Sequence, residues 1–194
     1  MLQESVGRVL EASVSRFLCA CHELDGAPPL GAAVVVMDTE PAIYGVVADM
    51  RTEGIDPGRR PAARGGPGDD RAAVLAQNPQ IPALLHTLFD CVVVGHARGG
   101  EVAGYLPDAP APIYARVRAC DRAETARLFE RPELFKLLLA SGALADEVAA
   151  ACLRRAVEGR SDRRAFLVRA GRALAHELAT EPDRLTAILS RIRP

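Results

Sequence analysis

Short apolar runs interrupted by Gly and Pro dominate the first 54 residues, and this pattern constrains the fold more than any other feature. Phe17, Cys19 and Cys21 fall on one face at the two-residue spacing of a strand. Short strands separated in this way are typical of a closed barrel or a sandwich, and closure removes exposed strand edges. The sequence therefore predicts a small closed β-barrel at the N-terminus. Its first four strands are expected at 6–10, 14–23, 32–37 and 43–50.

The runs also follow one another in a familiar order: VGRVLEASVSRF, PPLGAAVVVMD, YGVVADM and, over 90–117, DCVVVGHARGGEVAGYLPDAPAPIYARV. Taken together they resemble the HAS barrel (the HerA–ATP synthase barrel), over roughly the first two thirds of the chain. The matching positions are Gly7, Ser15, Phe17, Pro29, Gly31, Val34, Val36, Gly45 and Val47. The resemblance implies a barrel that contacts the barrels of neighbouring subunits.

In that family the barrel usually precedes a ring-forming ATPase domain, whereas no such domain follows here. The chain has no G-x-x-x-x-G-K-[ST] motif, and its only lysine, Lys136, lies in FKLLL. Without that loop and its lysine, nucleotide phosphates lack their standard binding site. The resemblance therefore implies a partner or assembly role without ATP hydrolysis and without a cofactor. The partner it implies is a HerA-like ATPase, an associated nuclease, or a second copy of the chain.

The remainder of the barrel domain, 1–119, is expected to contain a long flexible loop near 55–75. Gly and Pro are dense there, and Arg59, Arg60 and Arg64 make it basic. Such a loop is either a solvated insertion or a contact to a partner or to nucleic-acid phosphates. After it, PQIPALLHTLF predicts a helix over 79–89. Further strands are predicted at 90–97, 101–106 and 113–119, with a hairpin turn at Gly99-Gly100.

From Asp121 onward the apolar spacing changes to that of helices, so the second part of the chain, 120–194, is predicted to be an α-helical hairpin or bundle. Asp121 and Glu124 match a capping box. Further helices are expected over 132–141, along the stripe Leu144, Val148 and Cys152, after a Ser161 cap and after a Thr180 cap. The predicted fold class is α+β, a HAS-type barrel followed by helices.

This second part is also the basic part of the chain. Ten arginines and five acidic residues in 150–194 give it a net charge of +5, which leaves −6 for 1–149 out of the total of −1. Arg154, Arg155, Arg163, Arg164, Arg169 and Arg172 are the candidate contacts to phosphates or a partner. The alternative is an ordinary solvated helix face, which the near-zero net charge and the scarcity of aromatic residues favour.

No catalytic or metal-binding pattern emerges. Cys19-x-Cys21-His22 places two thiols on one strand face and the imidazole on the other, so the cysteines are interpreted as core thiols. His86 and His96 have no carboxylate placed to tune them. The sequence has no apolar run of transmembrane length and no leader pattern, and its five cysteines fit reduced thiols, so a cytoplasmic protein is expected.

Two functions follow from the sequence. The first is a non-enzymatic interaction and assembly module, in the form of an adaptor for a HerA-like DNA-processing ATPase. The alternative is a nucleic-acid-binding protein that uses the arginine-rich helices and the loop. An enzyme is the least favoured option.

Overall fold

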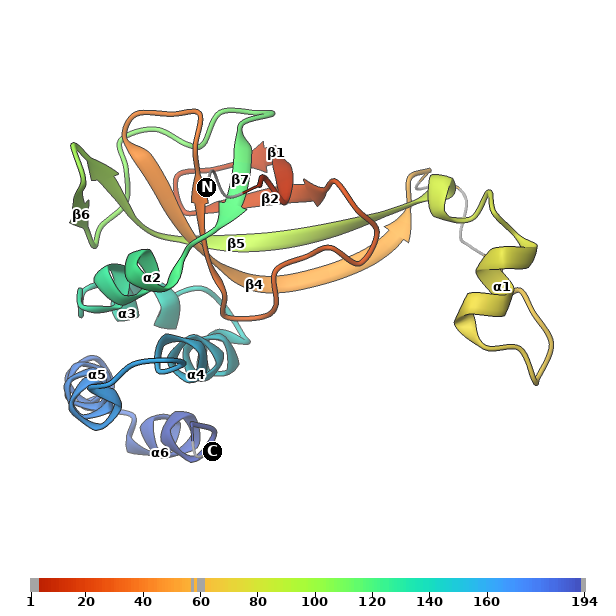
Figure 1. Cartoon of the computed structure of the whole chain (residues 1–194). Helices are drawn as coiled ribbons and strands as arrows, with labels where there is room; N and C mark the ends of the chain where they lie inside the picture. The colour runs from red at the N-terminus through yellow and green to blue at the C-terminus, as the bar shows by residue number, and fades with distance from the viewer. Residues whose placement is uncertain (1–3, 57, 59–61, 193–194) are drawn as a thin grey trace.

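A computed structural model of the chain describes residues 4–56, 58 and 62–192. A β-barrel lies above a layer of helices, and a long two-stranded arm leaves the barrel on one side (Figure 1). The strands are β1 (Gly7–Ala12), β2 (Arg16–Cys21), β3 (Ala33–Val36), β4 (Ala42–Gly54), β5 (Leu85–Arg98), β6 (Glu101–Ala103) and β7 (Arg116–Ala119). The helices are α1 (Arg71–Gln77), the 3-10 turn η1 (Pro82–Leu84), α2 (Arg122–Phe129), α3 (Leu134–Leu139), α4 (Ala145–Ala156), α5 (Arg163–Glu177) and α6 (Pro182–Ser190).

The antiparallel strands pair in the order β2-β1-β7-β3-β4-β5, and β5 pairs in turn with β2, which closes the barrel. The closing pairs run from Arg16↔Val92 to Ala20↔Leu88. Among the described strands, β6 pairs only with the C-terminal end of β5. The closed barrel and the helices that follow it confirm the predicted α+β class.

The barrel interior is filled by side chains from every second position of its strands. The largest of these are Phe17 and Phe89, both almost fully buried. A Cβ on Gly45 would lie 2.7 Å from Cζ of Phe17, so the glycine leaves room for that ring. The other buried members are Val9, Cys19, Val34, Val36, Ile43, Val47, Cys91, Val93, Ala111, Ala115 and Val117.

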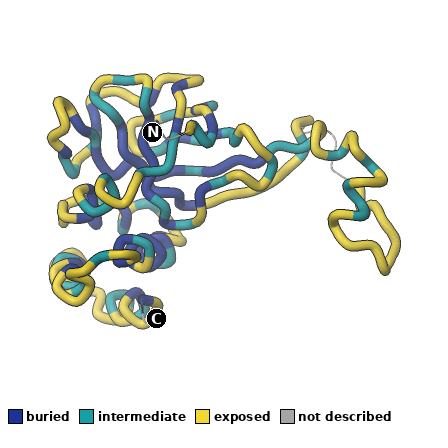
Figure 2. Tube along the Cα trace, viewed as in Figure 1, coloured by how far each residue is buried: buried dark blue, intermediate teal, exposed yellow. Residues whose placement is uncertain are grey.

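The opposite face of β3, β4 and β5 packs against the helices. Val35, Val46 and Val94 point into a second core, which also holds Phe135 and Val148 from the helical part. Because both faces of β3 are covered, all four of its residues are buried. The continuous Val34–Val36 run is thus explained by a strand that lies between two cores. Burial is densest in these strands and in α4 (Figure 2).

The helices form a stack below the barrel, with α4 between the barrel and the outer pair α5 and α6. Asp121 and Glu124 form the predicted capping box, since the Asp121 side chain accepts from the Glu124 N–H and the Glu124 side chain accepts from the Asp121 N–H. Apolar side chains at i, i+4 spacing line the inner face of α5 and are buried: Phe166, Ala170, Leu174 and Leu178.

Other details of the helical prediction were wrong. Leu144 is exposed and does not join Val148 and Cys152 in the core. The N-caps of α5 and α6 are Asp162 and Glu181, neither of which makes a side-chain capping bond. Each helix therefore starts later than predicted from Ser161 and Thr180, because tertiary packing of the apolar face fixes the start in place of a local cap.

The predicted helix over 79–89 was also wrong. Only η1 is helical there, and Leu85 already begins β5. The spacing of Ile81, Leu84, Leu85 and Leu88 fits a helix, but Leu84 is exposed and Leu88 pairs with both β4 and β2. Pairing with two neighbouring strands outweighs the local periodicity. The predicted loop near 55–75 in turn contains the start of a short helix, α1.

Candidate interaction site

The feature that most distinguishes this barrel is the arm formed by the ends of β4 and β5. Beyond the pairing with β3, strand β4 continues with β5 as a ribbon, paired from Asp49↔Asp90 to Gly54↔Leu85. Strand β5 still pairs with β2 as far as Leu88, so the ribbon leaves the barrel at Thr52↔Thr87. At the usual rise of a strand, these last three pairs extend it by about 10 Å. The chain between the strands carries η1 and α1 at the far end, well away from the body (Figure 1).

Polar contacts hold the ribbon together near the barrel. The hydroxyls of Thr52 and Thr87 lie 2.9 Å apart across the two strands, and the Asp25 N–H donates to Thr87 Oγ1 at 2.8 Å. Arg51 Nη1 donates to Asp90 Oδ2 at 3.0 Å, which compensates the carboxylates that face each other at the base of the ribbon. An ion pair between Arg71 and Asp25 joins α1 to the loop after β2.

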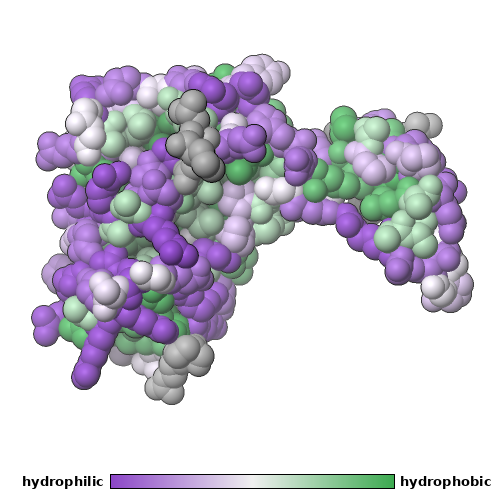
Figure 3. Space-filling view, in the orientation of Figure 1, coloured by the Kyte–Doolittle hydropathy of each residue, from purple (hydrophilic) through white to green (hydrophobic). Residues whose placement is uncertain are grey.

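The end of the arm leaves large apolar side chains in water. Ile55 and Leu84 are 55% and 60% exposed, and the Ile55 N–H donates to the Leu84 carbonyl at 3.0 Å. No residue of α1 is buried. Apolar residues gather on the visible face of the arm tip, where a wide hollow separates the arm from the helices (Figure 3). An exposed apolar group of this kind is typical of a binding surface.

The arm also offers strand edges. Pairing of β3 with β4 ends at Val46, and two further backbone bonds follow at Val47, whose N–H donates to the Ala32 carbonyl and whose carbonyl accepts from the Gly31 N–H. Within the described residues, Asp49–Gly54 therefore has β5 as its only neighbouring strand. Unpaired N–H and C=O groups on such an edge are able to accept an added strand from another protein.

The structure distributes the predicted arginines over several places. Arg59 and Arg60 lie outside the described residues, and Arg64 is exposed on the arm. Three of the helical arginines are engaged within the molecule. Arg154 Nη1 donates to the Arg191 carbonyl at 2.9 Å, Arg155 Nε donates to the Leu30 carbonyl at 2.8 Å, and Arg169 pairs with Glu130 at 3.0 Å and Asp162 at 3.2 Å.

The other three, Arg163, Arg164 and Arg172, are exposed and make no side-chain hydrogen bond or ion pair with described residues. All three belong to α5, at the outside of the helical stack. The six helical arginines thus do not form one continuous free patch.

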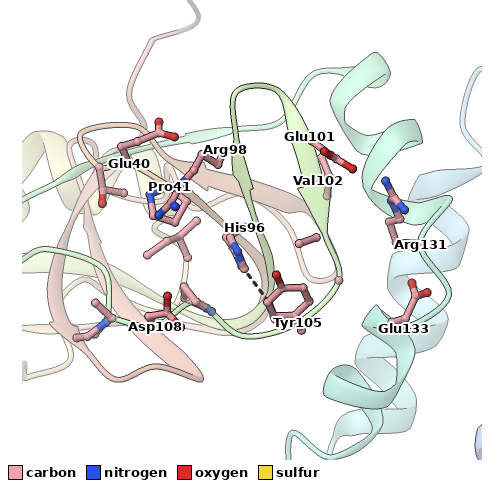
Figure 4. Close-up of a pocket in the computed structure, with 17 residues that line it drawn as sticks. Glu40, Pro41, His96, Arg98, Glu101, Val102, Tyr105, Asp108, Arg131 and Glu133 are labelled. Atoms are coloured by element: carbon pink, nitrogen blue, oxygen red, sulfur yellow. Dashed lines mark hydrogen bonds between the residues drawn. The ribbon is translucent and has the colours of Figure 1, made fainter.

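A pocket of about 830 Å³ lies between one end of the barrel and α3 (Figure 4). His96 Nδ1 lies 3.1 Å from the Tyr105 carbonyl, and its ring meets the edge of the Tyr105 ring at 4.9 Å. The wall carries both signs of charge, in Glu40, Arg98, Glu101, Asp108, Arg131 and Glu133. No nucleophile hydrogen-bonded to a base faces this pocket among the described residues, so its geometry assigns no reaction.

Burial confirms Cys19, Cys91 and Cys152 as core thiols and raises the pKa of each. Cys21, which was interpreted in the same way, is only half-buried, and so is Cys120. Burial also raises the pKa of the half-buried Cys21 to about 11. His22 Nε2 lies 3.2 Å from the Ser5 hydroxyl. Across the part of the chain that the structure describes, no three His, Cys, Asp or Glu side chains are grouped to hold a metal ion.

No protein-family profile matches the chain, and no curated protein is significantly similar to it. None of the described helices is both long and apolar enough to cross a bilayer.

Sequence reasoning missed the arm because the segment was divided into a loop and a helix. The signal was present on both sides of the loop. Thr52 and Thr87 are β-branched, and charged residues alternate with others over 49–53. A two-residue period of this kind, with β-branched residues, is typical of a strand.

Proposed function

We propose that this protein is a non-enzymatic interaction and assembly module that binds another protein through its β4–β5 arm. The observation that carries the proposal is the end of the arm, where Ile55 and Leu84 are more than half exposed and α1 has no buried residue. In the monomer these exposed side chains contribute no hydrophobic stabilisation. A partner that covers them would stabilise the complex by roughly 25 cal/mol for each Å² of apolar surface removed from water.

The proposed partner class is a protein with a barrel of the same kind. Closure leaves the barrel few free strand edges, whereas the arm projects from the barrel and presents its own edge and apolar tip. The resemblance to the HAS barrel supports the more specific role of an adaptor for a HerA-like DNA-processing ATPase or its nuclease. Self-assembly of this chain uses the same surface and is the other form of the proposal.

The test compares the full chain with the double variant I55S/L84S. Light scattering measures the mass of each protein in solution, and a pull-down from the native host after nuclease treatment identifies bound proteins. We expect the full chain to form a self-assembled species or to capture a partner with a barrel of this kind after nuclease treatment. The variant should do neither. The matched control V168S removes an apolar side chain that is exposed on α5 and should change nothing. A monomer that captures no such partner would refute the proposal.

The second candidate function is nucleic-acid binding. Arg163, Arg164 and Arg172 favour it, because they are exposed on one helix and free of partners among the described residues. We expect R163A/R164A to weaken binding to a DNA duplex and to reduce the salt dependence of the affinity. The control R98A/K136A removes the same charge from two other exposed positions. Equal affinity for wild type and R163A/R164A would reject this function.

A further inference from the structure

A second cavity, of about 460 Å³, opens where the start of α2 meets the end of α4. Three arginines line it from three different segments: Arg122 from α2, Arg155 from α4 and Arg160 from the loop that follows. Glu158 is the only carboxylate in the lining. Like charges gathered in one cavity repel each other unless an anion lies between them.

The three guanidinium groups differ in how far the protein already neutralises them. Arg160 is 12% exposed and is paired with Glu130 and Asp162, so its charge is compensated. Arg155 uses Nε for the Leu30 carbonyl and has no carboxylate within ion-pair distance among the described residues. Arg122 makes no side-chain hydrogen bond or ion pair with any described residue. Two cations in this cavity are therefore available to a ligand.

The backbone positions Arg122 over the loop. Gly159 has φ +72°, and a Cβ placed on it would lie 3.3 Å from Cζ and Nη1 of Arg122. A side chain at Gly159 would push this guanidinium away. The glycine therefore serves both the left-handed turn after α4 and the close approach of Arg122.

The rest of the lining consists of small residues, mostly alanines, together with Cys120, Thr125 and Gly159. The alanines are Ala32, Ala33, Ala119, Ala123, Ala126 and Ala156. Small residues leave space for the uncharged body of a ligand, while guanidinium groups are well suited to a phosphate.

We propose that this cavity binds a small organic phosphate of nucleotide size, with the phosphate at Arg122 and Arg155 and the uncharged body against the alanines. This site lies apart from the arm and goes beyond the assembly function proposed above, since neither site depends on the other.

Calorimetric titration of the full-length protein with adenosine monophosphate, and separately with inorganic phosphate, tests the proposal. We expect adenosine monophosphate to bind more tightly than phosphate alone. R122A should weaken both by at least tenfold, since it removes a cation that supports no other contact. A123L, which fills the cavity from an exposed helix position, should weaken the nucleotide more than inorganic phosphate.

K136A is the control, because it removes an exposed cation that lies outside the cavity and should leave both affinities unchanged. Circular dichroism of each variant shows whether the fold is retained. Absence of binding by both probes would overturn the proposal, and so would binding that R122A and K136A weaken equally. Since the arm variants leave this cavity intact, its binding and the assembly function fail or succeed separately.

Discussion

Gly31 lies so close to the backbone of Ala151 in α4 that a Cβ on the glycine would be 2.5 Å from the Ala151 carbonyl carbon. Its φ of +77° also belongs to the left-handed region. The contact sits where the chain enters β3 and where the barrel meets the helices. It therefore fixes the distance between the two parts of the molecule.

G31A should consequently destabilise the protein by about 3 kcal/mol or more, from backbone strain together with overpacking. Two controls separate these causes. Gly99 has φ +58° and an open surrounding, so G99A should cost only about 1–2 kcal/mol from strain. Gly68 has neither constraint, and G68A should leave stability within about 0.5 kcal/mol. Urea unfolding measures the free energy of unfolding of all three variants. Equal losses of stability in G31A and G99A would contradict the close contact.

A pH-dependent contribution is expected from Asp162. Hydrogen bonds from Arg160 and Arg169 lower the pKa of its carboxyl from 3.8 to about 2 in the folded protein. The folded state therefore keeps the carboxylate ionised where the unfolded chain protonates it. The stabilisation is complete above pH 4 and is lost as the pH falls from 4 to 2.

D162N removes this contribution at every pH. The difference in stability between wild type and D162N should be constant near neutral pH and should shrink between pH 4 and 2, as measured by urea unfolding at each pH. D183N, at an acidic residue with no ion pair among the described residues, is the control and should follow the wild type. If the difference in stability between wild type and D162N persists at pH 2, Asp162 acts through packing and not through its charge.

The arm should be removable without loss of the barrel. Gly54 and Leu85 are paired directly across the ribbon, so Asn-Gly in place of 55–84 joins them through a two-residue hairpin turn. Among the described residues, the ion pair lost between α1 and the barrel is the exposed Arg71–Asp25 pair, worth about 0–1 kcal/mol. We expect the melting temperature to change by a few degrees at most, about the effect of 1 kcal/mol. Loss of cooperative unfolding would show that the tip belongs to the folding core.

The thiols should be slow to react in the native protein. Burial raises the pKa of Cys21 to about 11, so roughly a thousandth of it is thiolate at pH 8. Cys19, Cys91 and Cys152 are buried as well. We expect a thiol reagent such as DTNB to modify Cys21 first and slowly, and to modify all five cysteines at once in denaturant. Fast labelling that survives in C21S would place a reactive thiol elsewhere.

The sequence predicted the features that depend on local patterns. The buried β3 followed from an unbroken valine run, and the start of α2 followed from the Asp121–Glu124 spacing. The long-range pairs could not be predicted in the same way. The β2–β5 pairs that close the barrel join residues about 70 positions apart, such as Phe17 and Cys91, and strand periodicity contains no information on which strand pairs with which.

The candidate sites were predictable to a smaller extent. Arg155 was singled out for its charge, but its bond to the Leu30 carbonyl depends on how α4 packs under the barrel. Arg122 and Arg160 were not singled out, because they meet Arg155 only when α2 and α4 come together. The resemblance to the HAS barrel, and the partners that it implies, remain a prediction.

Strand β5 has two roles along one length of chain. Its first residues form one strand of the arm, and the residues from Leu88 onward pair with β2 and close the barrel. A force applied at the arm tip is therefore transmitted along β5 directly to the pairs with β2 that close the barrel. A partner bound at the tip is in this way mechanically connected to the closing pairs of the barrel.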